Sequence, residues 1–154
     1  MFETRLYIQF SDTRLKVSSP SRSHTFECTP FVAIEDVKGG NKIITAIGRD
    51  AESLKGKPNI NVVNPFAHPR IVIGDFTVGE KLLQHAIRSF LKTGWLLPRL
   101  KGIMHPERDL EGGLTQVEIR SVRELCENAG CRWSAVHEGR ALTMEEVRTY
   151  EMRT

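Results

Sequence analysis

Few side chains in this sequence have the types and spacing that chemistry needs. His137 and Glu138 are neighbours and could act as an acid–base pair or as two metal ligands. The histidines show no spacing of a metal motif such as H-E-x-x-H, so we expect no metal site. They are His24, His68, His85, His105 and His137.

The three cysteines predict packing rather than reactivity. Their odd number and irregular spacing do not form a disulfide framework, which favours a reducing, cytoplasmic setting. Cys126 and Cys131 lie too far apart for a C-x-x-C motif, and we expect both to pack in the protein interior.

A short apolar tip stands where a polar turn would be usual, between an expected helix and an expected strand. It consists of Trp95, Leu96 and Leu97, and the basic residues around it are Lys92, Arg99 and Lys101. Tryptophan favours the bilayer interface, and a basic residue near anionic lipid adds about 1 kcal/mol of attraction. The pattern therefore favours contact with a membrane surface. Packing of the tip onto the core and a protein interface are the alternatives.

Basic residues recur along the same part of the chain and could form a patch. Nucleic-acid binding would normally add stacking aromatic residues or a known module, and neither is present. A solvated basic face is therefore the expected outcome, without a nucleic-acid partner. The residues are Arg88, Lys92, Arg99, Lys101, Arg120 and Arg123.

A helix must position the tip. Apolar residues recur at i, i+4 along one stripe, which predicts an amphipathic helix that ends at Gly94. The stripe is Val78, Leu82, Leu83, Ala86, Ile87, Phe90 and Leu91. The β-branched run Ile71–Ile73 predicts a strand before this helix, and Asp75 is expected to help cap it together with Thr77.

The remaining elements predict one α/β domain with a mixed sheet and helices packed on it. Strands are expected at 6–10, 15–17, 24–28, 31–34, 42–47, 59–63, 100–104 and 132–136, with residues 6–17 forming a hairpin. Helices are expected at 51–54, from Thr115 to about 128, and after Thr143. Thr115 and Glu118 have the capping-box spacing, and the second helix should bury Val117, Val122, Leu125 and Cys126. We expect a core of about 1–28 and 65–154, with a small β-rich insertion at about 29–64.

Composition is that of an ordinary folded protein. The chain has 154 residues, 40% of them hydrophobic and 27% charged, which suits one domain with a sizeable core. No apolar run approaches the ~20 residues of a membrane-spanning helix, and the first residues lack a secretory signal pattern. The net charge of +3 permits an anionic partner without requiring one.

Three motifs, in the right order, resemble one family. Ile73–Phe76 followed by Glu80–His85 is similar to I-A-D-F…E-K-M-L-Q-H, and Thr115–Arg120 is similar to T-Q-V-E-R-R. Ala46–Ala51 is similar to A-V-G-x-D-A. Over nearly its whole length the chain resembles the N-terminal half of the bacterial actins of the rod-shape-determining MreB type. The resemblance implies a ribonuclease-H-like fold of the actin and Hsp70 superfamily.

The resemblance also implies where a nucleotide would bind, and the chain departs from the family there. In the first phosphate-binding hairpin, D-L-G-T-A-N-T, Gln9 replaces the carboxylate and Ser11 replaces the glycine, in a shorter loop. In the E-E-P motif, Glu138 matches the first glutamate and Gly139 stands where the second orients water, although a one-residue shift would restore it. The degenerate positions are Gln9, Ser11, Asp12, Thr13, Asp75, Glu138 and Gly139.

The rest of the family's nucleotide site belongs to the half that the resemblance does not cover. We therefore expect no ATPase activity and neither ATP nor Mg²⁺ as a cofactor. The expected function is a non-catalytic, actin-like domain in bacterial cell shape or the cytoskeleton, cytoplasmic and peripheral on the inner face of the membrane. Its expected partners are a second copy of itself, a full-length bacterial actin filament, and the membrane surface. A residual ATP-binding protein or weak ATPase is the alternative, and a decayed duplicate without an independent role is a third.

Overall fold

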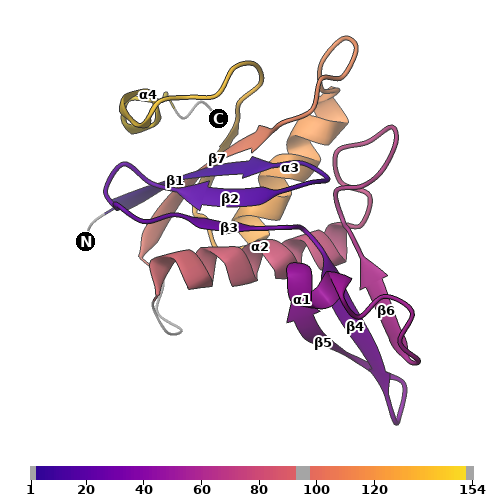
Figure 1. Cartoon of the computed structure of the whole chain (residues 1–154). Helices are drawn as coiled ribbons and strands as arrows, with labels where there is room; N and C mark the ends of the chain where they lie inside the picture. Colours follow the sequence, from indigo (N-terminus) through magenta and orange to yellow (C-terminus); the bar gives the residue numbers. More distant parts are fainter. Residues whose placement is uncertain (1–2, 93–97, 152–154) are drawn as a thin grey trace.

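The computed structural model describes residues 3–92 and 98–151, and two sheets organise them (Figure 1). The larger sheet has five strands in the order β3-β2-β1-β7-β8, and the smaller has three in the order β5-β4-β6. The strands are β1 Glu3–Phe10, β2 Leu15–Ser18, β3 Phe26–Cys28, β4 Val32–Val37, β5 Asn41–Ile47, β6 Ile60–Val63, β7 Arg99–Pro106 and β8 Trp133–Val136. The helices are α1 Arg49–Glu52, α2 Phe76–Leu91, α3 Gln116–Asn128 and α4 Met144–Arg148.

The larger sheet is mixed, as the sequence predicts. β1, β2 and β3 form an antiparallel meander, whereas β1, β7 and β8 run parallel to one another. The register pairs Phe10 with Pro106, so the carboxyl ends of β1 and β7 finish side by side. Residues almost a hundred positions apart therefore meet at one edge of the sheet.

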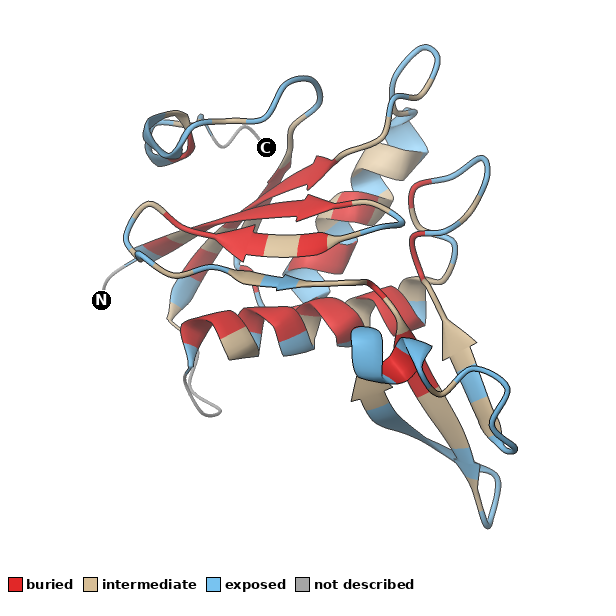
Figure 2. Cartoon of the chain, viewed as in Figure 1, coloured by how far each residue is buried: buried red, intermediate tan, exposed pale blue. Residues whose placement is uncertain are grey.

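Helices α2 and α3 cover one face of this sheet, and the main core lies between them and the strands (Figures 1 and 2). Alternation along β1 sends Leu6, Ile8 and Phe10 into that core and leaves Tyr7 on the opposite face. There Tyr7 packs with Ile103 and with Val147 of α4. The predicted hairpin, the helix over 78–91 and the mixed sheet are confirmed.

Two predictions, the buried stripe of α3 and the strand before α2, are wrong in part or in full. Val117 is 75% exposed rather than buried, and only Val122, Leu125 and Cys126 of α3 are buried. Residues 71–73 form no strand and lie in an irregular segment before α2. Asp75 does cap α2, because its carboxylate accepts a hydrogen bond from the Val78 N–H at 3.0 Å. Thr77, in contrast, lies within the helix.

Helix α2 ends earlier than its sequence pattern predicts. Its last residue is Leu91, and Lys92 follows in the left-handed conformation with φ of 54°. That conformation ends the helix before the predicted stop at Gly94, a residue outside the described ranges. None of the described helices has the length and apolar character needed to cross a bilayer. The division into a core and an inserted subdomain at 29–64 stays a prediction.

Candidate functional site

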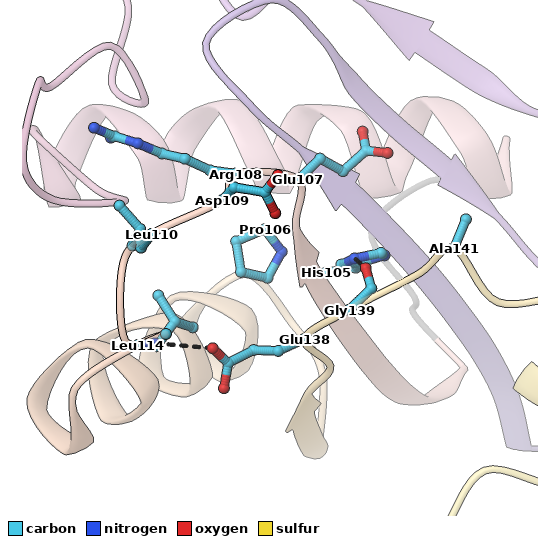
Figure 3. A pocket seen from close by; sticks show the side chains of 11 residues that line it. His105, Pro106, Glu107, Arg108, Asp109, Leu110, Leu114, Glu138, Gly139 and Ala141 are labelled. Carbon is cyan, nitrogen blue, oxygen red and sulfur yellow. Dashed lines mark hydrogen bonds between the residues drawn. The ribbon is translucent and has the colours of Figure 1, made fainter.

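The candidate site lies at the carboxyl ends of the parallel strands β1, β7 and β8. In α/β sheets, ligands bind in the crevice outside these strand ends. Two cavities open here, of about 360 Å³ and about 470 Å³, and both are lined by Glu107 and Arg108. Figure 3 shows the first of them, with the loop after β7 on one side and Glu138 and Gly139 after β8 on the other.

The β1–β2 turn forms one wall, and its own serine occupies its backbone donors. The Ser11 N–H donates to the Arg14 carbonyl at 2.9 Å, which closes the turn. The Ser11 hydroxyl oxygen accepts from the N–H groups of Thr13 at 3.2 Å and Arg14 at 3.3 Å. Free backbone N–H groups are what a turn offers to a phosphate, and here two of them already have a partner. The Asn64 amide also donates to the Asp12 carbonyl at 2.7 Å and ties the turn to the loop after β6.

An ion pair fills the space between this turn and β7. Arg14 donates to both carboxylate oxygens of Glu107, from Nε at 2.9 Å and from a terminal nitrogen at 2.8 Å. The side-chain amide of Gln9, itself only 6% exposed, donates to the same carboxylate at 3.2 Å. The hydrogen bonds from Arg14 are the main cause that lowers the pKa of Glu107. The carboxylate therefore stays ionised, and it shares the Arg14 guanidinium with Glu27, whose carboxylate is 3.5 Å from the other terminal nitrogen.

His105 lies beside this ion pair, and its contacts select one tautomer of the neutral ring. Its Nε2 is 3.0 Å from the Gly139 carbonyl, so Nε2 donates there, and in the neutral ring Nδ1 is then the acceptor. The Tyr7 hydroxyl, 2.5 Å from Nδ1, is therefore the donor in that bond. The Tyr7 oxygen in turn accepts from the Leu142 N–H at 3.0 Å. This chain of bonds holds the segment after β8 on the outer face of the sheet.

Acid should weaken this arrangement. Burial is the largest cause that lowers the pKa of His105 below its ordinary value of 6.5. The unfolded state then binds its proton at a higher pH than the folded state does, so the free energy of unfolding falls as the pH drops below about 6.5. The slope from this one group is at most about 1.4 kcal/mol per pH unit. Urea unfolding at pH 7.5 and 5.5 measures it.

The matched variants for this pH dependence are His105→Gln and His85→Gln, because His85 is exposed on α2. We expect His105→Gln to flatten the fall in unfolding free energy and His85→Gln to leave it as in the wild type. An equal fall in the His105→Gln protein would show that His105 is not its source.

The other side chains predicted for the site have separate structural partners. One carboxylate oxygen of Glu138 accepts from the Leu114 N–H at 2.8 Å, at the loop that leads into α3 (Figure 3). His137 donates from Nε2 to the Arg140 carbonyl at 2.8 Å. Glu138 lines the smaller cavity and His137 does not, and Asp75 lines neither cavity. Among the described residues, no three His, Cys, Asp or Glu side chains gather as a ligand set for a metal.

The predicted membrane tip, Trp95, Leu96 and Leu97, lies outside the described residues. Its flanking Lys92 and Arg99 are exposed. Lys101 is instead used within the fold, because it pairs with Glu3 at 3.1 Å and stands 5.1 Å from the centre of the Trp133 ring. Membrane contact by the tip stays a prediction.

Sequence reasoning missed the residues that dominate the site. Glu107, Arg108 and Arg14 were not among the residues predicted for the site. Arg108 donates to the carbonyls of His68, Pro69 and Ile71, the last at 2.9 Å, and so fixes the segment before α2. A usable signal was present, since Glu107 comes three residues after the strand expected at 100–104, which was predicted to lie in the same sheet as β1.

Comparisons with known proteins agree with the resemblance seen in the sequence. The family described as MreB/Mbl protein matches residues 19–143. The cell shape-determining protein MreB of Escherichia coli K12 is 34% identical over 135 residues, which are 86% of this chain and 37% of that protein. The corresponding protein of Haemophilus influenzae is 31% identical over 98 residues, 64% of this chain and 27% of that protein. The chain thus spans well under half the length of these curated relatives.

Solved structures show the same fold. MreB5 of Spiroplasma citri bound to ADP superimposes with a TM-score of 0.67 at 18% identity, over 88% of this chain and 38% of that one. MamK in a double helical filament gives a TM-score of 0.64 at 15% identity, over 88% of this chain and 40% of that one. The fold prediction, a ribonuclease-H-like half of the actin type, is confirmed.

Proposed function

The chain belongs to the MreB/Mbl protein family, and from that membership we propose that it is a non-catalytic, actin-like domain whose role is binding. The observation that carries the proposal is the pair of hydrogen bonds from Arg14 to Glu107 at 2.9 and 2.8 Å. This ion pair stands at the strand ends where the resemblance places the first phosphate-binding hairpin.

Phosphoryl transfer depends on positioning and on stabilising negative charge. At this site the Ser11 hydroxyl already engages the N–H groups of Thr13 and Arg14, and Glu107 engages the Arg14 guanidinium. The first carboxylate of the family pattern is Gln9, which brings no charge to a metal–nucleotide complex. A nucleotide phosphate would have to displace Glu107 before it could bind Arg14, which supports a binding role without catalysis.

The relatives suggest what that binding serves. The curated relatives are named for cell-shape determination, and MamK has been solved as a double helical filament. The proposed role of this chain is to support cell shape by association with itself or with a longer actin-like filament on the cytoplasmic side of the membrane. Contact of residues 93–97 with anionic lipid is part of this proposal, and the exposed side chains of Lys92 and Arg99 are available to support it.

Titration with Mg-ATP in a calorimeter tests the non-catalytic part. We expect no saturable heat and no thermal shift at millimolar nucleotide, while a full-length actin-like relative in the same buffer gives both. Saturable binding by this chain would contradict the proposal and favour the residual ATP-binding alternative. For the binding part, the chain should pellet with preassembled filaments of that relative, or else sediment as an oligomer when alone.

A further inference from the structure

One outer edge of the smaller sheet is formed by β5. β5 ends the strand order β5-β4-β6, and its residues 41–45 are all exposed (Figures 1 and 2). Ile43 and Ile44, at 46% and 38%, are among the large hydrophobic side chains with the greatest exposure in the described part of the chain. Within residues 3–92 and 98–151, no strand pairs with this edge.

We infer that this edge pairs with β5 of a second copy of the chain. The two strands run antiparallel about a two-fold axis at Ile43, and the two small sheets join into one. The inference rests on the binding role proposed above and names one partner and one surface for it. It places Ile43 opposite Ile43 of the second copy and Lys42 opposite Ile44.

The two isoleucines favour pairing along the edge over docking on a face. Neighbouring residues of a strand point to opposite faces of the sheet, so Ile43 and Ile44 lie on different sides. A partner laid against one face would leave the other isoleucine in water. A strand added at the edge places side chains beside both, and its main chain satisfies the open N–H and C=O groups.

The edge also lacks the usual protection against such pairing. Native edge strands are often blunted by lysines, prolines or inward-pointing charges. The only charged residue in β5 is Lys42, and a single lysine near one end of the strand leaves the rest of the edge without such protection. The irregularity at Ala33/Ile34 leaves Thr45 without a counterpart in β4, which limits regular pairing to the outer half of β5.

Charge favours a second copy in the antiparallel direction. A parallel pair would set Lys42 beside Lys42, and like charges directly opposite each other destabilise a strand pair. In the antiparallel pair, the register about Ile43 sets Lys38, exposed in the turn before β5, level with Gly48 at the start of α1 in the other copy. Asp50 and Glu52 of α1 are exposed there and outweigh the single charge of Arg49.

Sedimentation velocity over a concentration series tests the inference on the full chain. The variants are Ile43→Lys, Ile43→Glu and an equimolar mixture of the two, with Val117→Lys as the control on another exposed β-branched residue. The wild type and Val117→Lys should show a reversible dimer. Each Ile43 variant alone should dimerise at least about tenfold more weakly, because like charges meet at the axis. The mixture should recover the dimer, since lysine then faces glutamate.

The outcomes separate this inference from the proposed function. A monomeric wild type at every concentration, or a dimer that neither Ile43 variant weakens, would overturn pairing through β5. Either result would leave the pelleting of the chain with actin-like filaments as an independent measure of the proposed binding role. Single variants that dissociate, with recovery in the mixture, would establish the axis at Ile43.

Discussion

Replacing Gly102 with alanine should destabilise the protein by about 3 kcal/mol, the upper part of the range for overpacking a core. A β-carbon at this position in β7 would stand 2.2 Å from the sulfur of Cys126 and 2.9 Å from the sulfur of Cys131. Both cysteines are buried, at 0% and 3% exposure, so neither sulfur can move into solvent. Helix α3 must therefore shift away from the sheet. Urea unfolding at neutral pH measures the loss.

A second substitution tests the cause. Cys126→Ala in the Gly102→Ala background removes the closer sulfur and should restore part of the lost stability, although Cys126→Ala alone leaves a cavity and destabilises. If a clash is relieved in this double-mutant cycle, the double variant loses less stability than the sum of the two single variants. Gly79→Ala is the matched control, because its nearest contacts would be an ordinary 3.6 Å and alanine favours a helix interior. Additive losses in the cycle would contradict this explanation.

The contact at Gly102 also shows what the sequence could predict. The helical period and the stop after it predicted α3 with Cys126 buried, but nothing local says that Cys126 and Cys131 meet over one glycine of β7. Val117 fails for a related reason: it fits the period, yet it lies in the first turn of α3, before the buried residues begin at Val122. The helical period predicts which face of a helix is apolar. How much of that face is buried depends on the extent of the sheet packed against it.

The strand prediction for residues 71–73 is wrong because a residue far away in the sequence holds their backbone. β-branched residues favour a strand, but the carbonyl of Ile71 accepts from Arg108, which is 37 residues away in the chain. Without a neighbouring strand, β propensity alone does not make a ladder. The hydrogen bond to the Arg108 guanidinium therefore sets the backbone conformation of this segment.

The candidate site was the least predictable part for the same reason. Arg14 and Glu107 are separated by 93 residues, and Tyr7 and His105 by 98. Each pair meets because β1 and β7 are parallel neighbours in the sheet. The hydrophobic periodicity of a sequence does not show which strands pair with each other. Substitutions at Gln9 and Ser11 could be recognised as departures from a family pattern. The contacts that close the site could be seen only in the fold.

Truncating Phe90 should cause the largest loss of all, about 3–5 kcal/mol of unfolding free energy for Phe90→Ala. Phe90 is 1% exposed in the last turns of α2, and its ring lies 4.9 Å from the ring of His24. The substitution removes the ring from the core where α2 packs near β3, and the fixed backbone around it leaves a cavity. The His24 side chain would keep its bond to the Phe90 carbonyl, so the loss reports packing.

Val117→Ala is the matched control for the stability loss of Phe90→Ala. Both residues were predicted on buried helical stripes, but Val117 is 75% exposed, and its truncation should change stability by less than about 0.5 kcal/mol. Chemical denaturation of the two variants under one condition distinguishes the burial seen in the structure from the burial predicted by the sequence pattern. Losses of similar size would mean that α3 turns Val117 inward. A small loss for Phe90→Ala would mean that this ring does not anchor the end of α2.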